Sequence, residues 1–210
     1  MTTGKFIAFE GGEGTGKSTQ AKLLAEALQE EGITSILTRE PGGTIGAEAI
    51  RNLVLDPPGD GWNIEAEALL FAAARADHVS KKIIPALKSG TWVICDRFID
   101  SSRAYQGAAG MLGDDAILRL HEIGSGGIRP DLVILLLVDE DNVSDRLIKR
   151  DGNESDAIGG RNLSYHRNVS ESFKDLASAN PDQFMAIEAG GIPKEVHKKI
   201  VHAVLTLLER

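Results

Sequence analysis

Residues 6–19 read Phe-Ile-Ala-Phe-Glu-Gly-Gly-Glu-Gly-Thr-Gly-Lys-Ser-Thr, the most informative segment of the chain for its fold. A short apolar run leads into a turn with the spacing Gly-x4-Gly-Lys-Ser, and a helical pattern follows directly. Glycines let backbone N–H groups turn toward phosphate oxygens without a Cβ in the way, and a helix N-terminus adds its positive dipole end. The stretch therefore predicts a strand, a nucleotide phosphate-binding loop and a helix.

An ordinary glycine-rich turn is the alternative interpretation, which the flanking strand and helix patterns weaken. In a phosphate-binding loop, Lys17 reaches the β- and γ-phosphates and the Ser18 hydroxyl is a ligand of Mg²⁺. We expect the whole loop to bind the nucleoside triphosphate through Gly11, Gly12, Glu13, Gly14, Thr15, Gly16, Lys17, Ser18 and Thr19.

Outward from the loop, short apolar runs alternate with longer helical patterns. The runs occupy residues 6–10, 35–38, 92–95, 132–138 and 184–187, and the helical patterns occupy residues 17–31, 46–55, 65–88, 114–124, 141–150, 164–179 and 194–208. Continuous apolar runs are typical of strands buried on both faces, and alternating β and α segments favour a parallel sheet. We predict one α/β domain over residues 1–210, a three-layer fold of the P-loop NTPase type with five parallel strands and helices on both faces.

The composition excludes several classes of protein. Hydrophobic residues at 42% and charged residues at 26% are typical of a globular chain, not of a disordered or collagen-like one. A net charge of −8 disfavours a nucleic-acid or anionic membrane partner, because such surfaces attract a basic stripe. The single cysteine, Cys95, excludes an internal disulfide, and no apolar stretch is long enough to span a bilayer. We expect a cytoplasmic protein.

Two further segments lie at predicted strand ends, where ligands bind in parallel sheets. Residues 38–43 read Thr-Arg-Glu-Pro-Gly-Gly, and residues 96–107 read Asp-Arg-Phe-Ile-Asp-Ser-Ser-Arg-Ala-Tyr-Gln-Gly. With these segments the chain closely resembles the bacterial thymidylate kinase (dTMP kinase) family over nearly its whole length. The resemblance implies that the chain uses ATP and Mg²⁺ to phosphorylate dTMP to dTDP, as a homodimer.

Two alternatives remain open at this point. One is a small P-loop kinase that acts on a different nucleoside monophosphate. The other is a nucleotide-dependent binding switch that only hydrolyses its nucleotide slowly.

Phe71 and Arg75 are four residues apart in the predicted helix 65–88, so they share one face. An aromatic ring offers a base a stacking surface worth about 1–3 kcal/mol. An arginine can donate to thymine O4, where cytosine presents an amino donor instead. Core packing is the alternative for Phe71 alone; Arg75 on the same face favours a binding site, because an unpaired guanidinium is rarely buried.

The family resemblance implies further roles for individual residues. It implies contacts to dTMP from Glu13, Arg51, Arg97, Ser102, Tyr105 and Gln106, and we expect Glu40, Phe71 and Arg75 to contact dTMP as well. Among them, Arg51 matches a residue that binds the monophosphate, and its alternative is a solvated surface arginine. Arg97 matches a phosphate contact, and its alternative is an ion pair with a nearby carboxylate. Tyr105 matches a residue that crowds the sugar 2′ position, and Glu13 one that accepts from the 3′-hydroxyl.

Asp96 is a carboxylate at a strand end, suited to holding Mg²⁺ directly or through water, with Glu40 as a possible second carboxylate. We expect His78 to pack on or cap its helix. Cys95, which precedes Asp96 in the strand, is expected to be a small core residue.

Residues 146–167 are predicted to form a lid, because a polar segment rich in Gly, Asn, Ser and Asp lies between arginines. The family carries a basic residue either in the phosphate loop or in the lid. Positions 12–15 of this loop contain none, so the chain resembles the form with lid arginines. The family's Asp-Arg-x-Glu lid signature is altered here to Gly-Arg-Asn-Leu at residues 160–163. We expect Lys17, Arg97, Arg161 and Arg150 to be catalytic, with Arg161 the first choice in the lid.

Overall fold

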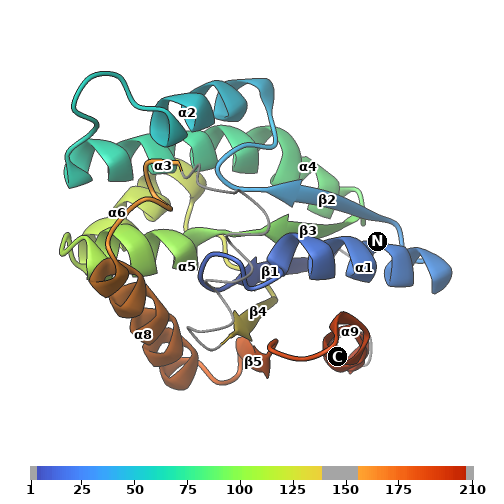
Figure 1. The fold of residues 1–210 in the computed structure, drawn as a ribbon. Helices are drawn as coiled ribbons and strands as arrows, with labels where there is room; N and C mark the ends of the chain where they lie inside the picture. Colours follow the sequence, from blue (N-terminus) through green and yellow to red (C-terminus); the bar gives the residue numbers. More distant parts are fainter. Residues whose placement is uncertain (1–3, 139–155, 207–210) are drawn as a thin grey trace.

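Five parallel strands form the middle layer of the molecule in a computed structural model, which describes residues 4–138 and 156–206 (Figure 1). The strands run in the order β2-β3-β1-β4-β5, with all neighbours parallel. Their bounds are Phe6–Glu10 (β1), Ser35–Arg39 (β2), Trp92–Asp96 (β3), Leu132–Leu137 (β4) and Phe184–Glu188 (β5). The predicted five-stranded parallel sheet of the P-loop NTPase type is confirmed.

The central strand β1 is buried on both faces, which explains its continuous apolar run. Ile7 and Phe9 pack on one side against residues of α1 (Lys17–Glu30) and α9 (Pro193–Leu205). Phe6 and Ala8 pack on the other side, in a cluster that includes Ile83. Successive side chains of a strand point to opposite faces, so a strand between two helical layers needs apolar residues at every position.

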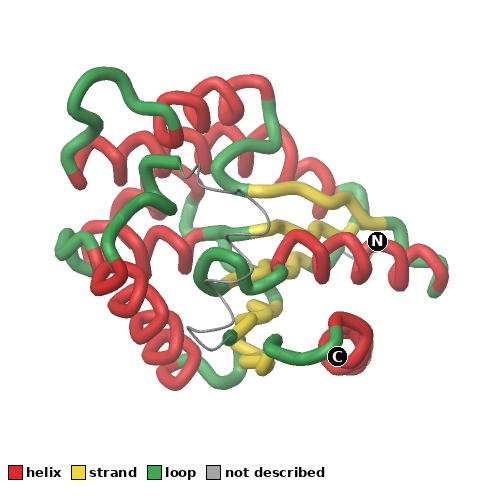
Figure 2. The backbone as a smooth tube through the Cα atoms, viewed as in Figure 1, coloured by secondary structure: helices red, strands yellow, loops and turns green. Residues whose placement is uncertain are grey.

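The helices that cover the Phe6 and Ala8 face of the sheet are mainly α3 (Ile64–His78), α6 (Asp114–Ser125) and α8 (Leu163–Ala179). The helix α2 (Ile45–Leu55) packs on α3 from outside. Figure 2 shows the strands gathered in the middle of the molecule with the helices around them. None of the helices in the described segments is long and apolar enough to cross a membrane.

The helix predicted over residues 65–88 is interrupted. α3 continues into a short π-helical segment, η1 (Val79–Ile83), and then into α4 (Ile84–Lys88). Pro85 stands near the start of α4 and has no N–H to donate to the preceding turn. A wider turn before the proline accommodates that missing hydrogen bond.

A helix that the sequence did not predict follows β3. It consists of α5 (Ile99–Ser102) and a π-helical continuation, η2 (Arg103–Ala109). These residues carry most of the second sequence segment quoted above, so its side chains are presented by a helix. The predicted helix over residues 141–150 lies outside the described residues.

Candidate active site

The phosphate loop connects β1 to α1 at the carboxyl edge of the sheet. Gly11, Gly14 and Gly16 have φ angles of 134°, 67° and 93°, in the region that side chains with a Cβ rarely adopt. A Cβ at Gly11 would also lie 2.5 Å from the carbonyl oxygen of Leu136 on the neighbouring strand β4. The glycine spacing read from the sequence is therefore required by both backbone conformation and packing.

Lys17 turns its ammonium group back into the loop. Its Nζ donates to the carbonyl oxygens of Gly11 at 3.1 Å and Gly12 at 2.6 Å. Burial, followed by the nearby charge of Arg97, lowers the pKa of Lys17 to about 8. A bound phosphate would favour the charged form, because an anion compensates for the lost solvation.

Ser18 and Asp96 meet beside the loop. The Ser18 hydroxyl, in the first turn of α1, donates to a carboxylate oxygen of Asp96 at the end of β3. These two hard oxygen donors fit Mg²⁺. Within the described part of the chain, no group of three or more His, Cys, Asp or Glu side chains could hold a metal. The two donors therefore fit an ion that takes its remaining ligands from phosphates and water.

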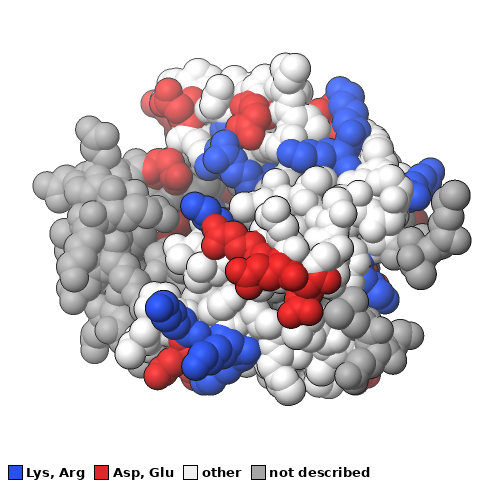
Figure 3. Space-filling view, turned by 90° about the vertical axis from the view of Figure 1, so that its right-hand side faces the viewer, with Lys and Arg blue, Asp and Glu red and all other residues white. Residues whose placement is uncertain are grey.

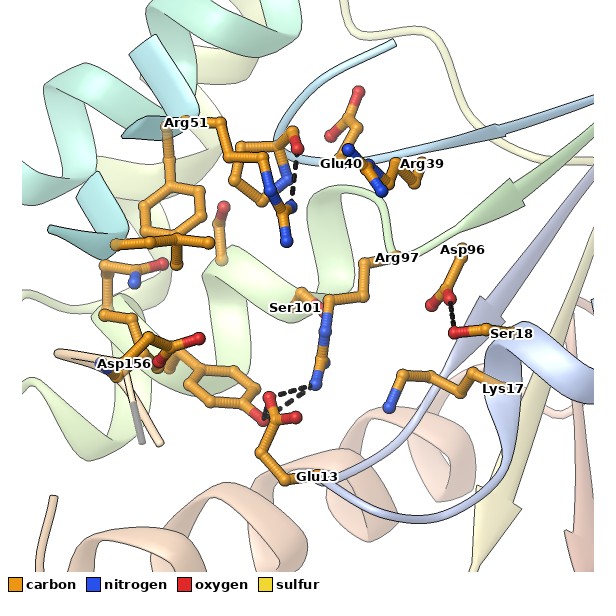
Figure 4. Close-up of a pocket in the computed structure, with 17 residues that line it drawn as sticks. Glu13, Lys17, Ser18, Arg39, Glu40, Arg51, Asp96, Arg97, Ser101 and Asp156 are labelled. Carbon is orange, nitrogen blue, oxygen red and sulfur yellow. Dashed lines mark hydrogen bonds and ion pairs between the residues drawn. The ribbon is translucent and has the colours of Figure 1, made fainter. Parts of the chain in front are cut away.

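A cavity of about 280 Å³ opens beside the loop and is here called the Arg97 pocket (Figure 4). Its walls come from the loop, the ends of β2 and β3, and helices α2, α3, α5 and η2. Residues predicted from the sequence form most of its lining: Glu13, Lys17, Ser18, Glu40, Arg51, Phe71, Asp96, Arg97, Ser102, Tyr105 and Gln106.

Arg97 lies between the loop and the pocket wall. Its guanidinium donates to Gly11 O at 3.0 Å, Ser101 Oγ at 3.1 Å, Glu13 Oε1 at 2.6 Å and Tyr105 Oη at 3.2 Å. Burial opposes its charge, but Tyr105, Glu13 and nearby carboxylates outweigh burial and raise the pKa of Arg97. Its φ of 69° is unusual for a residue with a side chain, and such strained backbone persists where surrounding contacts hold it. Arg97 therefore forms an ion pair with Glu13, as its alternative interpretation expected, and both residues line the Arg97 pocket.

Glu10, at the end of β1, fixes the segment that follows Arg97. No role for Glu10 was predicted from the sequence. Its carboxylate accepts hydrogen bonds from the backbone N–H of Phe98 at 2.8 Å and Ser101 at 3.1 Å, and from Ser101 Oγ at 2.6 Å. Burial and the nearby charge of Asp100 raise the pKa of Glu10 to about 7. A glutamate at the end of an otherwise apolar buried strand was the available signal, since buried carboxylates need partners.

Arg75 is buried and forms an ion pair within the protein. From the sequence, its guanidinium was expected to lack a protein partner and therefore to face a ligand. Its Nε donates to Glu40 Oε2 at 2.7 Å, and its Nη2 donates to Ser102 Oγ at 2.9 Å and Phe98 O at 3.2 Å. Phe71 lines the Arg97 pocket, and Arg75 lies behind that wall. Among described residues, Arg75 Nη1 has no hydrogen-bond partner, so a base contact by Arg75 stays a prediction.

His78 is fully buried, so of the two roles expected for it the packing role fits the structure. The His78 ring lies within hydrogen-bonding distance of Thr38 Oγ1 (2.7 Å) and Glu40 Oε1 (3.0 Å), so it links β2 to the helix instead of capping it. Both Glu40 oxygens are engaged, one by His78 and one by Arg75. Glu40 therefore holds Arg75 and His78 in this structure, and its expected part in the metal site beside Asp96 stays a prediction.

Arg51 reaches the Arg97 pocket from α2. Its Nη1 donates to the carbonyl oxygen of Pro41 at 2.8 Å. Burial and the charge of Arg39 lower the pKa of Arg51. A half-buried guanidinium facing a cavity is unlike the solvated surface arginine considered as its alternative. Arg51 and Arg97 thus place two positive charges on separate walls of one pocket (Figure 4).

A second cavity of about 380 Å³, here called the α8 pocket, lies between the phosphate loop, the end of β4 and α8. Arg161 lines it, pairs with Glu67 and donates to Tyr165 Oη. Arg150 lies outside the described residues. Asp156, which the sequence reasoning missed, lines the Arg97 pocket and accepts backbone hydrogen bonds from Ile158 and Gly159.

A phosphate loop at the carboxyl end of the central strand, with one pocket on each side of it, defines a P-loop NTPase that has room for two ligands. A family model described as thymidylate kinase matches residues 9–200. The chain therefore belongs to the thymidylate kinase family.

Individual relatives agree with this assignment. The chain is 50% identical over 205 residues to a thymidylate kinase of Rhizorhabdus wittichii, covering 98% of this chain and 99% of that one. It is 45% identical to a thymidylate kinase of Symbiobacterium thermophilum, covering 98% and 94% of the two chains. The crystal structure of thymidylate kinase from Ehrlichia chaffeensis superposes with a TM-score of 0.78 at 32% identity, covering 96% of this chain and 99% of that one.

Proposed function

We propose that this chain is a single kinase domain, residues 1–210, which transfers the γ-phosphoryl group of ATP to dTMP and produces dTDP for dTTP synthesis. The observation that carries the proposal is the position of Arg97. Its guanidinium contacts the phosphate loop at Gly11 O and the pocket wall at Tyr105 Oη. A charge at that place can bind both the donor and the acceptor phosphate during transfer.

The donor nucleotide binds with its phosphates in the loop. Backbone N–H groups of residues 11–19 surround the phosphates, and Lys17 neutralises charge on the β- and γ-phosphates. Ser18 and Asp96 would hold Mg²⁺ together with phosphate oxygens and water. When bound, the ion neutralises the charge that develops on the transferring group.

The acceptor dTMP occupies the Arg97 pocket. Arg51 and Arg97 bind its monophosphate, and Phe71 offers its ring to the base from the pocket wall. Glu13 and Tyr105 line the same pocket near Arg97 and contact the sugar. The resemblance assigns Ser102 and Gln106 to positions near the base, and Arg75 donates to thymine O4 through its Nη1.

No general base is needed for this reaction. A phosphate monoester has a second pKa of about 6, so the acceptor is mostly dianionic at pH 7. Catalysis then depends on positioning and charge neutralisation by Lys17 and Arg97, together with Arg161 and Arg150 from a lid over residues 146–167.

A cytoplasmic homodimer is part of this proposal. Leu53 on α2, Leu69 on α3 and Ile123 on α6 are 44%, 57% and 85% exposed, on helices that pack side by side. Exposed apolar side chains on adjoining helices favour an interface with a second copy. Light scattering after gel filtration measures the mass, and a monomer at micromolar concentration would contradict this part.

A nucleic-acid partner has no support in the surface charge. On the described residues of the face in Figure 3, Lys and Arg form separate groups around a band of Asp and Glu. A nucleic-acid backbone would favour a continuous basic track instead.

One coupled assay tests the function. ADP formation is measured with ATP, Mg²⁺ and each of dTMP, dUMP, dCMP, AMP and GMP, with a Lys17→Ala variant as control. We expect dTMP to be phosphorylated with the highest kcat/KM. A higher kcat/KM for another monophosphate would indicate a small P-loop kinase with a different substrate. ADP formation at the same rate without any monophosphate would indicate a nucleotide-dependent binding switch.

A further inference from the structure

Glu67 lies between the two pockets and contacts both sides. This α3 side chain is buried, and its residue is 3% exposed. Its Oε1 accepts a hydrogen bond from Gln106 Nε2 at 2.8 Å, and its Oε2 pairs with Arg161 Nη2. Gln106 lines the Arg97 pocket, whereas Arg161 lines the α8 pocket. One carboxylate therefore joins a residue of each pocket.

The hydrogen-bonding chemistry of Glu67 makes this link directional. A carboxylate only accepts, so Glu67 requires the amide nitrogen of Gln106 to face it and leaves the amide oxygen directed elsewhere. The same carboxylate needs a cation on its second oxygen, because an unpaired buried charge is costly. Moving Arg161 away would leave Glu67 without that cation and weaken its hold on Gln106.

A second connection runs parallel to the first. Arg161 Nη1 donates to Tyr165 Oη, and Tyr165 Oη donates to the carbonyl oxygen of Tyr105 at 2.7 Å. The Arg161 guanidinium also lies 4.6 Å from the centre of the Tyr165 ring. Arg161 is thus joined to η2 at two points, through Glu67 to Gln106 and through Tyr165 to Tyr105.

We propose that Glu67 is a positioning residue that couples the two pockets, so that the orientation of Arg161 and the orientation of Gln106 change together. The inference rests on the proposed function in assigning ATP to the loop side and dTMP to the Arg97 pocket. Binding of one nucleotide then changes the affinity for the other, and by linkage the factor is the same in both directions. Both connections begin at Arg161, which Glu67 holds by its charge. Loss of that charge releases Arg161 and removes this factor, while the phosphate contacts stay in place.

The test measures dTMP affinity by calorimetry with and without a saturating non-hydrolysable ATP analogue and Mg²⁺. We expect the analogue to change dTMP affinity by about 5-fold or more in the unmodified protein, the usual lower range for coupled sites. In Glu67→Gln we expect the ratio to fall to within about 2-fold of one. The matched control is Asp100→Asn, which neutralises a buried carboxylate paired with Arg103 and Arg129 outside both pockets. It should keep the unmodified ratio.

A purely structural role for Glu67 makes a different prediction. It would lower the Tm of Glu67→Gln and leave the coupling ratio unchanged, and that result would overturn the proposal, as would a ratio of one in the unmodified protein. If Glu67→Gln does not fold, Arg161→Gln breaks the same bridge from its more exposed end, and an unchanged ratio there also overturns it.

Hydrogen exchange separates this proposal from the proposed function. Exchange of the η2 amides, residues 103–109, is followed after adding the ATP analogue without dTMP. Protection in the unmodified protein that is lost in Glu67→Gln supports coupling, and equal protection in both overturns it. Failure to phosphorylate dTMP would contradict the proposed function alone, because this measurement contains no dTMP.

Discussion

Replacing Glu10 with Gln should change how the stability of this protein depends on pH. Glu10 is fully buried, and its pKa is raised from 4.5 to about 7 by burial and then by Asp100. Between these values the folded state binds more protons than the unfolded state, so the Glu10 contribution to stability falls as pH rises. A difference of about 2.5 pKa units corresponds to about 3 kcal/mol. The free energy of unfolding should therefore lose about that amount between pH 4.5 and 8 on account of Glu10.

Urea unfolding at pH 5, 6.5 and 8 measures this effect. Glu10→Gln removes the titrating group, so its stability relative to the unmodified protein should improve from pH 5 to pH 8 by about 2–3 kcal/mol. Glu48→Gln is the matched control. The pKa of Glu48 is lowered, chiefly by the Gly43 backbone hydrogen bond, so the stability it contributes is lost only at acid pH. Its curve should run parallel to that of the unmodified protein over pH 5–8. If the Glu10→Gln curve also ran parallel to that of the unmodified protein, Glu10 would not titrate with a raised pKa.

Three further predictions concern activity. Lys17→Ala should lower kcat by about 100-fold or more with little change in Tm, because Lys17 is expected to neutralise charge on the transferring phosphate. A steady-state kcat within tenfold of the unmodified protein would disprove that residues 11–19 bind the phosphates of ATP. If Arg75 donates to thymine O4, Arg75→Ala should narrow the dTMP-to-dCMP ratio of kcat/KM. It should also destabilise the fold by about 3–5 kcal/mol, because buried Glu40 loses its guanidinium and keeps only His78 as a side-chain partner. An unchanged ratio would show that Arg75 does not contact the base. The double variant Arg161→Ala with Arg150→Ala should lower kcat by about 10³-fold and raise KM for ATP much less. A near-normal kcat of this double variant at saturating ATP and dTMP would exclude a lid mechanism.

The elements that sequence predicted well are those specified by local chemistry. The phosphate loop depends on glycines at positions of positive φ and on a helix that begins directly after Gly16. The strand β1 is recognisable because burial on both faces demands a continuous apolar run. Parallel strands then bring their carboxyl ends to one edge, which is why Ser18 and Asp96 could be placed together before the structure was known.

Two of the errors involve partners distant in sequence. The helix α5–η2 has no cap of its own; its first N–H groups are satisfied by Glu10, 88 residues before Phe98. Without that carboxylate in view, the segment has the composition of a loop. Arg75 was judged unpaired because its partner Glu40 lies 35 residues away on another element.

The fold class, the phosphate loop and most residues around the Arg97 pocket can be predicted from the amino-acid sequence. Spacing, hydrophobic periodicity and the preference of glycine for positive φ act over a few neighbouring residues, so they can be read along the chain. The pairing of charged groups depends on the folded chain: Glu40 pairs with Arg75, and Glu67 pairs with Arg161 across 94 residues. Burial makes each of these carboxylates require a cation, but only the folded chain determines which cation lies within reach.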